Sequence, residues 1–517
     1  MLPPKAPLSI LDVSTKESQH LEWFRRRTAS KLPGSFICEF WETLLFQASL
    51  KEPAVLHAVL ALSSVHKSGT LALERPKSKH VNTNEEEQFT LQQYVQAIGH
   101  LQPHFLVKDR ASFRVALISC IVFVCMELLR GHFETAQCHL QNGLKVLEEV
   151  QLLAKPPSDR NDGVRTLKPR REPVDEWIFE AFCRLAIQVA LFNKAFRHSC
   201  IDLHVGGLGP PGPRFYGLND AWQHLQHILN RTFQLAEQVS RQNSTNIPTV
   251  RASVYTEQQE QILLDLAGYL VVYKASKKTL EGEKFTQAEK AHKLLRLYHI
   301  LATIMANTCL HPNDESIFDS QTDQFVSLVK QATGLAIVSA EMNPLQPIQG
   351  HAIDMSRSIT DLGWIAPLFY AATKCRIPRV RLHAIKLIES SSHREGIWDG
   401  GVAVCIARKV MDIENQGFYR PAELAEDFSI FSNPRPQDLS LPILPQTQRV
   451  SMVEVVFSGD PMETILLHYE QLRADSGQTV GTWEYSIASQ RWKDRGSSVV
   501  YSACSNWVPG SEEQHCG

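Results

Sequence analysis

The sequence predicts an all-α fold of packed helical hairpins, and two observations support this prediction. Apolar residues recur at spacings of three and four from Phe36 to about Glu414, which is the period of amphipathic helices. Alternation typical of strands begins only after about residue 420. We therefore expect a multi-helix domain followed by a small, irregular C-terminal extension.

The first strong helix begins at Pro53. Proline in a first turn loses no hydrogen bond, and Glu52 before it interacts favourably with the positive end of the helix dipole. Apolar side chains follow at helical spacing, at Val55, Leu56, Val59, Leu62 and Val65. The acidic run 85–87 begins a second helix in the same way.

Two further helices, 112–129 and 132–150, are expected to form a hairpin at Gly131. The spacing of Gly131, Phe133, Ala136, Leu140 and Leu144 is that of a tetratricopeptide-type hairpin. A small residue at Ala136 would let the two helices approach closely. No second copy follows at a period of about 34 residues, so we predict one hairpin and no repeat array.

The remaining helices follow from the same apolar period. We predict them at 175–196, 218–239 with Asn219 or Asp220 as the cap, 257–279, 285–308, 317–339, 363–376, 378–390 and from about 400 to Glu414. Pro378 separates two of them because it disfavours helical geometry in the residue before it. Polar or glycine- and proline-rich composition predicts loops near 155–173, 206–217 and 241–250.

These elements divide the chain into three segments. Residues 1–35 are expected to be linker-like, 36–420 to form the helical domain, and 421–517 to form a mixed, partly irregular extension. In the extension, RVSMVEVVFS and GTWEYSIASQRW alternate polar and apolar residues as strands do.

Composition narrows the functional classes. The chain has 517 residues, 43% of them hydrophobic and 21% charged, which is typical of a soluble globular protein with more than one helical subregion. A formal net charge of −2 gives no overall electrostatic reason to bind nucleic acid. The N-terminus lacks the pattern of a signal peptide. The apolar run 115–129 is shorter than the ~20 residues that cross a bilayer, so we expect a buried helix and no membrane partner.

No residue pattern indicates a catalytic, cofactor or metal site. His198, Cys200 and His204 are the best metal candidates, but they lack a fourth nearby ligand and match no closed-site spacing. The pairs Cys138–His139 and His224–His227 fail for the same reason. The eleven cysteines include no C-x2-C pair, and we interpret them as reduced core residues. Phosphate-loop, G-x-S-x-G and H-E-x-x-H motifs are absent, so we predict no catalytic residues, no cofactor and no enzyme.

Four segments carry a family resemblance. They are FWETLLFQASLKEPAVLHAVLALSSVH at 40–66, ELLRGHFETAQCHLQNGL at 127–144, GWIAPLFYAATKCRIPRVRLHAIKLI at 363–388 and HREGIWDG at 393–400. In this order they resemble the regulatory middle domain of fungal zinc-cluster transcription factors, over roughly 20–420. The family's six-cysteine binuclear zinc cluster has no counterpart in these residues. The matching positions, among them Trp41 and Trp364, are types that build cores, so no ligand site is carried over.

The resemblance implies a nuclear transcription regulator, often of a secondary-metabolite gene cluster or a nutrient pathway. Its expected partners are proteins, either a complete transcription factor or the transcription machinery. DNA contact would be indirect or would need an N-terminal module, and a small-molecule effector, if present, is unidentified.

Three explanations of the missing cluster stay open at this stage. The gene model begins at an internal methionine, since MLPPKAPLSI resembles the linker that follows the cluster. Alternatively, the protein is a paralogue without a cluster that acts through partners. The third alternative is a helical scaffold or small-molecule-binding protein with no transcriptional role.

Overall fold

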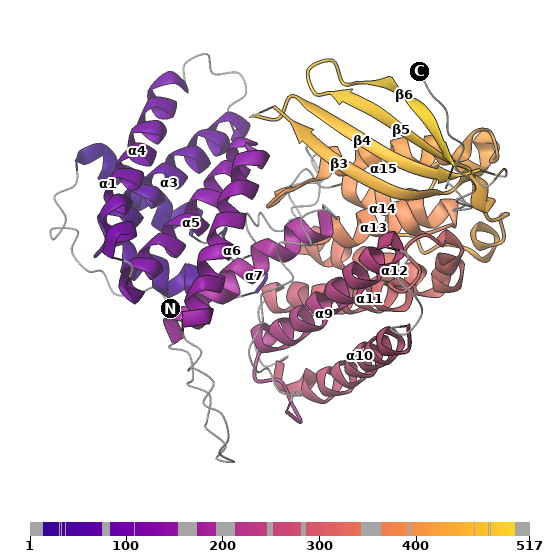
Figure 1. Cartoon of the computed structure of the whole chain (residues 1–517), viewed down its shortest axis with the longest axis horizontal. Coiled ribbons are helices and arrows are strands. Elements are labelled where there is room, and N and C mark those ends of the chain that lie inside the picture. Colours follow the sequence, from indigo (N-terminus) through magenta and orange to yellow (C-terminus); the bar gives the residue numbers. More distant parts are fainter. Residues whose placement is uncertain are drawn as a thin grey trace, which may run out of the picture.

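A computed structural model of the chain describes residues 14–74 apart from 30, 33 and 37, 83–153 apart from 108, 173–192, 212–245, 252–280, 286–342, 363–390 and 394–501 apart from 460, 474 and 476. Most of these residues are helical, and a four-stranded antiparallel sheet lies near the C-terminus (Figure 1). The all-α prediction is therefore right for the bulk of the chain and wrong for the extension, which contains a regular sheet.

The N-terminal helices form one bundle, drawn in indigo and purple in Figure 1. Its elements are α1 (Thr15–Trp23), η2 (Phe24–Thr28), η3 (Phe40–Leu44), α2 (Leu45–Ser49), α3 (Pro53–Glu74), α4 (Thr83–Val107), α5 (Arg110–Arg130) and α6 (Phe133–Leu153). Here η2 and η3 are single π-helical turns. The predicted helices from Pro53 and from the acidic run 85–87 are thus both present.

The linker-like segment predicted for 1–35 is instead partly helical. Ser14 and Glu17 form a capping box, because the Ser14 Oγ accepts from the Glu17 N–H at 3.3 Å and the Ser14 N–H donates to Glu17 Oε2 at 2.8 Å. Leu21 and Phe24 are buried in the bundle. The prediction overlooked this S-x-x-E signature, so residues from Ser14 onward belong to the folded domain.

The α5–α6 hairpin forms where the sequence predicted it. Gly131 lies between the helices with a φ of +79°, a left-handed conformation that glycine adopts without strain. Helix α5 is long and apolar enough to cross a membrane, but 72% of its apolar window is buried inside the bundle. Close approach occurs at Gly143 in α6, where a Cβ atom would lie 2.5 Å from the Phe182 ring.

A second group of helices lies beside the bundle, with α7 between the two groups (Figure 1). Its elements are α7 (Pro173–Phe192), α9 (Leu218–Thr245), α10 (Ala252–Leu280), α11 (Thr286–Thr308), the 3-10 helix η4 (Glu315–Gln321) and α12 (Thr322–Met342). Helix α9 differs from its prediction at both ends. It continues to Thr245, into the predicted linker 241–250, and Asn219 and Asp220 lie inside its first turn rather than at the cap.

The other predicted loops are described only in part. Residues 212–217 are irregular, as expected, whereas 206–211 and 155–172 lie outside the described residues. Residue 173 already belongs to α7.

Three helices carry the C-terminal half of the family motifs: α13 (Ile365–Lys374), α14 (Pro378–Glu389) and α15 (Gly400–Asn415). The predicted break at Pro378 is confirmed, since Ile377 before it is extended with φ −92° and ψ 114°. Between α14 and α15 the sequence REGIWD forms a small hairpin of β1 (Arg394–Glu395) and β2 (Trp398–Asp399), which was not predicted from the sequence.

The C-terminal sheet is a meander of β3 (Val450–Ser458), β4 (Thr464–Leu472), β5 (Gly477–Ser486) and β6 (Arg491–Tyr501). Figure 1 shows it beside α13, α14 and α15. Phe457 of β3 packs against Phe133 of α6 and Phe192 of α7, with ring centroids 4.7 and 4.8 Å apart. The sheet therefore joins both helical groups. Between α15 and β3 the chain is irregular, with short 3-10 turns η6 (Pro421–Leu424), η7 (Pro436–Leu439) and η8 (Gln446–Gln448).

Candidate functional site

The first metal candidates cannot be placed, because His198, Cys200 and His204 lie outside the described residues. Cys138 is exposed on α6. Its neighbour His139 forms a hydrogen bond through Nε2 with the Tyr94 hydroxyl at 2.8 Å. Cys138 and His139 therefore have ordinary structural surroundings.

The other pair lies on α9. The Nδ1–H of His224 donates to the Asp220 carbonyl at 2.9 Å, and its hydrogen bond with the Asp220 side chain raises the pKa of His224. Burial lowers the pKa of His227. Across the part of the chain that the structure describes, no three His, Cys, Asp or Glu side chains gather as metal ligands would.

The β1–β2 hairpin explains why the motif HREGIWDG has its particular residues. Glu395 is fully buried and accepts hydrogen bonds from the backbone N–H groups of Trp364 at 2.8 Å and Ile365 at 3.1 Å. These are the first N–H groups of α13, so the carboxylate caps that helix and complements its dipole. Gly363 must be glycine, since a Cβ there would lie 2.1 Å from Glu395 Oε1.

The same hairpin contacts two more helices. The Trp398 indole N–H donates to the Gln188 carbonyl of α7 at 3.2 Å, and Asp399 Oδ1 accepts from the Val402 N–H of α15 at 3.0 Å. Gly396, with φ +60°, packs against the Gln188 side chain. The β1–β2 hairpin thus positions α7, α13 and α15, which is a structural role.

A buried charge cluster lies where α13, α14 and α15 meet the start of β3. Glu414 of α15 is fully buried between Arg376 Nη1 at 2.9 Å and Arg381 Nη1 at 2.5 Å. Glu315 pairs with Arg376 and with Lys374 Nζ, the latter at 2.6 Å. We call Glu315, Asp319, Lys374, Arg376, Arg381, Glu414 and Arg449 the charge cluster.

The cluster extends to the C-terminal sheet. Glu414 Oε1 accepts from the backbone N–H of Val450, the first residue of β3, at 2.9 Å. Arg449 donates to the Glu315 carbonyl at 3.0 Å and pairs with Asp319 at 3.0 Å. Burial alone would raise the pKa of Glu414, but Arg381 and Arg376 outweigh burial and hold that pKa below its usual value.

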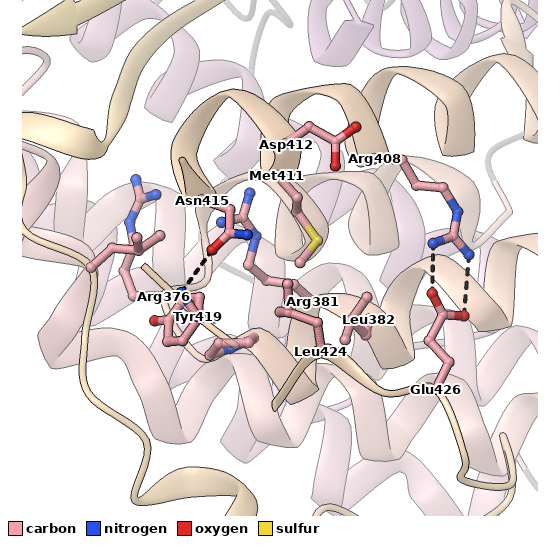
Figure 2. Close-up of a pocket in the computed structure, with 12 residues that line it drawn as sticks. Arg376, Arg381, Leu382, Arg408, Met411, Asp412, Asn415, Tyr419, Leu424 and Glu426 are labelled. Atoms are coloured by element: carbon pink, nitrogen blue, oxygen red, sulfur yellow. Dashed lines mark hydrogen bonds and ion pairs between the residues drawn. The ribbon is translucent and has the colours of Figure 1, made fainter. Parts of the chain in front are cut away.

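A cavity of about 220 Å³ lies against one side of this cluster (Figure 2). Arg376 and Arg381 reach it from the region of α14, and residues of α15 and of the irregular segment after it complete the wall. Apolar lining comes from Pro378, Leu382, Met411, Leu424 and Leu444, and polar lining from Arg376, Arg381, Arg408, Asp412, Asn415, Tyr419 and Glu426.

The rim of the cavity is held by an ion pair. Arg408 of α15 binds Glu426 through Nη1 at 2.6 Å and Nη2 at 3.2 Å, as Figure 2 shows. Tyr419 donates its hydroxyl to the Pro442 carbonyl at 2.7 Å, and burial raises its pKa to about 12, so the phenol is neutral at physiological pH. The site is thus a hollow with a mixed polar and apolar wall that includes three guanidinium groups.

Sequence reasoning missed this site, although one signal was available. In RIPRVRLHAIKLI three arginines, Arg376, Arg379 and Arg381, stand in an otherwise apolar pattern. Arginines in a buried helix need carboxylate partners, which here come from Glu315 and Glu414, far away in the sequence. Periodicity alone cannot identify such partners.

The chain is similar in sequence to known transcription regulators. Residues 26–410 match the family model described as the fungal specific transcription factor domain. The aspercryptin biosynthesis cluster-specific transcription regulator atnN of Emericella nidulans is 21% identical over 441 residues, which cover 72% of this chain and 70% of that protein. The transcription regulator lscL of Purpureocillium lilacinum is 26% identical over 162 residues, or 29% of this chain and 36% of that protein. No solved structure matches the chain.

Proposed function

Because the chain belongs to the fungal specific transcription factor domain family, we propose that this transcription regulator controls the genes of one biosynthetic cluster from the nucleus. The names of its relatives support the proposal, since one is a biosynthesis cluster-specific transcription regulator and the other a transcription regulator. The helical scaffold without a transcriptional role, the alternative from sequence, has no comparable support.

The observation that carries the proposal is the extent of the family match. It covers 26–410, which includes the N-terminal bundle from the end of η2 onward, the second helical group, the β1–β2 hairpin and most of α15. The similarity therefore involves the whole helical architecture rather than one short motif.

The proposal assigns the regulatory contacts to other proteins, either a complete transcription factor or the transcription machinery. The 517 residues carry a formal net charge of −2 and contain no C-x2-C pair. Specific DNA binding needs phosphate neutralisation and side chains presented to base edges. DNA contact is then made through partners or through an N-terminal module beyond these residues, and the chain has no catalytic role.

Chromatin immunoprecipitation of the tagged protein, paired with gel shift of the pure chain, tests this proposal. We expect enrichment at promoters of one gene cluster in cells, together with no specific shift of those promoter duplexes by the 517-residue polypeptide at physiological salt. Expressing it with and without each candidate transcription factor identifies the partner. Cytoplasmic location with no chromatin signal under inducing conditions would contradict the regulator, and a specific shift by the pure chain would contradict indirect DNA contact.

A further inference from the structure

We propose that the cavity between α14, α15 and η6 is an effector site for a small organic anion, a monocarboxylate with a short apolar body. Its regulatory meaning rests on the proposed function, whereas the binding itself does not. Three features of the cavity support this site: unpaired buried donors, a local excess of positive charge, and its size and lining.

The first observation is a pair of buried guanidinium groups that lack full pairing. Arg381 is 2% exposed, and its Nη2 has no hydrogen-bond partner among the described residues. Arg376 is 1% exposed, and its Nε is unpaired in the same part of the chain. Both residues line the cavity. A buried donor without an acceptor is costly, so a ligand oxygen that accepts from either nitrogen would be stabilised there.

Figure 2 shows how the donors are placed. The Arg381 side chain extends from α14 toward α15 and ends beside Asn415 and Met411. Its other two nitrogens are occupied, because Nε donates to the Ala372 carbonyl at 2.6 Å and Nη1 pairs with Glu414. The guanidinium is therefore fixed in orientation, and Nη2 is its one nitrogen without a protein acceptor among the described residues.

Charge favours an anion over a neutral acceptor. The charge cluster holds four cations, Lys374, Arg376, Arg381 and Arg449, against three carboxylates, Glu315, Asp319 and Glu414. A ligand carboxylate would balance this excess, and guanidinium binds carboxylate through charge-assisted hydrogen bonds.

Two carboxylates of the cavity wall oppose an anion, but both lie at the rim. Glu426 pairs at 2.6 Å with Arg408, which it shares with Glu389. Asp412 is exposed, and burial of part of its carboxyl raises its pKa despite Lys409 and Arg408 nearby. The base of the cavity therefore remains positive.

Size and lining define the rest of the ligand. A volume of about 220 Å³ lies below the roughly 300–1,000 Å³ of ordinary small-molecule pockets, so the ligand must be small, such as an acid of about eight non-hydrogen atoms. Five apolar side chains line it, from Pro378, Leu382, Met411, Leu424 and Leu444. Such a wall favours a short aliphatic or compact body over a polyhydroxylated one.

The position also explains how occupancy could be sensed. Arg381 and the N–H of Val450 share Glu414, so an anion on Arg381 acts on the carboxylate that positions the first residue of β3. Ligand binding would thus change the contact between α14, α15 and the sheet.

Isothermal titration calorimetry of the full chain with hexanoate and with hexanamide tests the proposal. The two probes share their apolar body and differ in charge. We expect saturable binding of hexanoate with a Kd of about 1 mM or lower, and binding of hexanamide at least about tenfold weaker. No saturable hexanoate binding up to about 10 mM, or equal affinity for both probes, would overturn the assignment.

A matched pair of variants locates the site. Met411→Trp fills the cavity without removing or adding a charged group and should weaken hexanoate binding by at least about tenfold, whereas Met411→Leu conserves volume and should leave it within about twofold. Circular dichroism checks that both variants fold. If Met411→Trp does not fold, hexanoate binding is measured with Arg381→Lys instead. Hexanoate binding unchanged in the folded Met411→Trp or Arg381→Lys variant would contradict this location. Because these readouts need neither DNA nor transcription, their failure is distinct from failure of the proposed function.

Discussion

The N-terminal bundle and the region of α13 to α15 are both helical, yet they are held together by different interactions. The bundle buries a mostly apolar set, for example Ile121, Val122 and Met126 along α5, and its one buried carboxylate in that helix, Glu127, pairs with the neighbouring Arg130 and His132. The α13–α15 region buries Arg376, Arg381 and Glu414 beside its apolar residues. Apolar packing is non-directional and tolerates exchange of similar volumes, whereas a buried ion network requires particular partners. The two regions should therefore respond differently to the same kinds of perturbation.

The largest expected effect is in the charge cluster. Glu414→Gln removes the carboxylate between two buried guanidinium groups, and breaking a buried pair in this way costs about 3–5 kcal/mol of unfolding free energy. Urea denaturation followed by tryptophan fluorescence measures the change. A loss below about 1 kcal/mol would show that solvent or relaxation replaces the carboxylate, and the contrast between the two regions would fail.

Acidification should affect both regions through one buried histidine each. Burial lowers the pKa of His20 in the bundle and of His383 in α14 to about 4, from an ordinary value of 6.5. Between pH 6.5 and pH 4 each histidine is protonated in the unfolded chain and neutral in the folded one. The free energy of unfolding therefore keeps its full value above pH 6.5 and falls as the pH drops toward 4.

At pH 5 the loss relative to pH 7 is about 2 kcal/mol for each histidine. Glu414 contributes its own loss only at lower pH, because its lowered pKa lies below the ordinary 4.5. His383→Gln should remove only the contribution of His383, about 2 kcal/mol between pH 7 and pH 5, since glutamine can still donate to the Ile430 carbonyl that His383 binds at 2.7 Å. Denaturation at pH 5 and pH 7 tests this, and an unchanged difference in the variant would exclude His383 as a source.

Overpacking should lower the unfolding free energy most in the apolar bundle. Gly143→Ala places a Cβ about 2.5 Å from the Phe182 ring and 2.7 Å from Cys120 Sγ, which forces the helices apart. Such strain lowers the unfolding free energy by about 1–3 kcal/mol, and the better helix propensity of alanine offsets up to about 1 kcal/mol of this loss.

Gly99→Ala in α4 is the matched control for this substitution. A Cβ there meets nothing within 4 Å, so it should stabilise the protein by about 0.5–1 kcal/mol. Equal thermal shifts for the two variants would argue against close packing of α6 at Gly143.

Short-range features of the two helical regions could be predicted from the sequence, whereas contacts between residues far apart in the chain could not. Helix period, Pro378 and Gly131 act over a few residues, and they correctly placed the breaks between helices. The charge cluster joins Glu315 to Arg376 and Glu414 to Val450, across long stretches of chain, and no local pattern encodes such pairs. The sheet was only half recognised, because GTWEYSIASQRW spans the end of β5, a turn and the start of β6.

The smallest effect is expected at the rim of the cavity. Arg408 pairs with Glu389 and Glu426, but these side chains are 36%, 40% and 30% exposed, so solvent screens the interaction. Arg408→Gln should change the unfolding free energy by about 0–1 kcal/mol, against the several kcal/mol of Glu414→Gln. A loss comparable to that of Glu414→Gln would show that exposure does not separate the two ion networks.

The most direct test of the regulatory role is RNA sequencing of a strain that lacks the gene, complemented with the wild-type chain or with Glu414→Gln. We predict that deletion alters the transcripts of a limited gene set that includes one biosynthetic cluster, that the wild-type chain restores them, and that Glu414→Gln restores them poorly because its fold is destabilised. Unaltered transcripts in the deletion strain under conditions that induce the cluster would contradict the account.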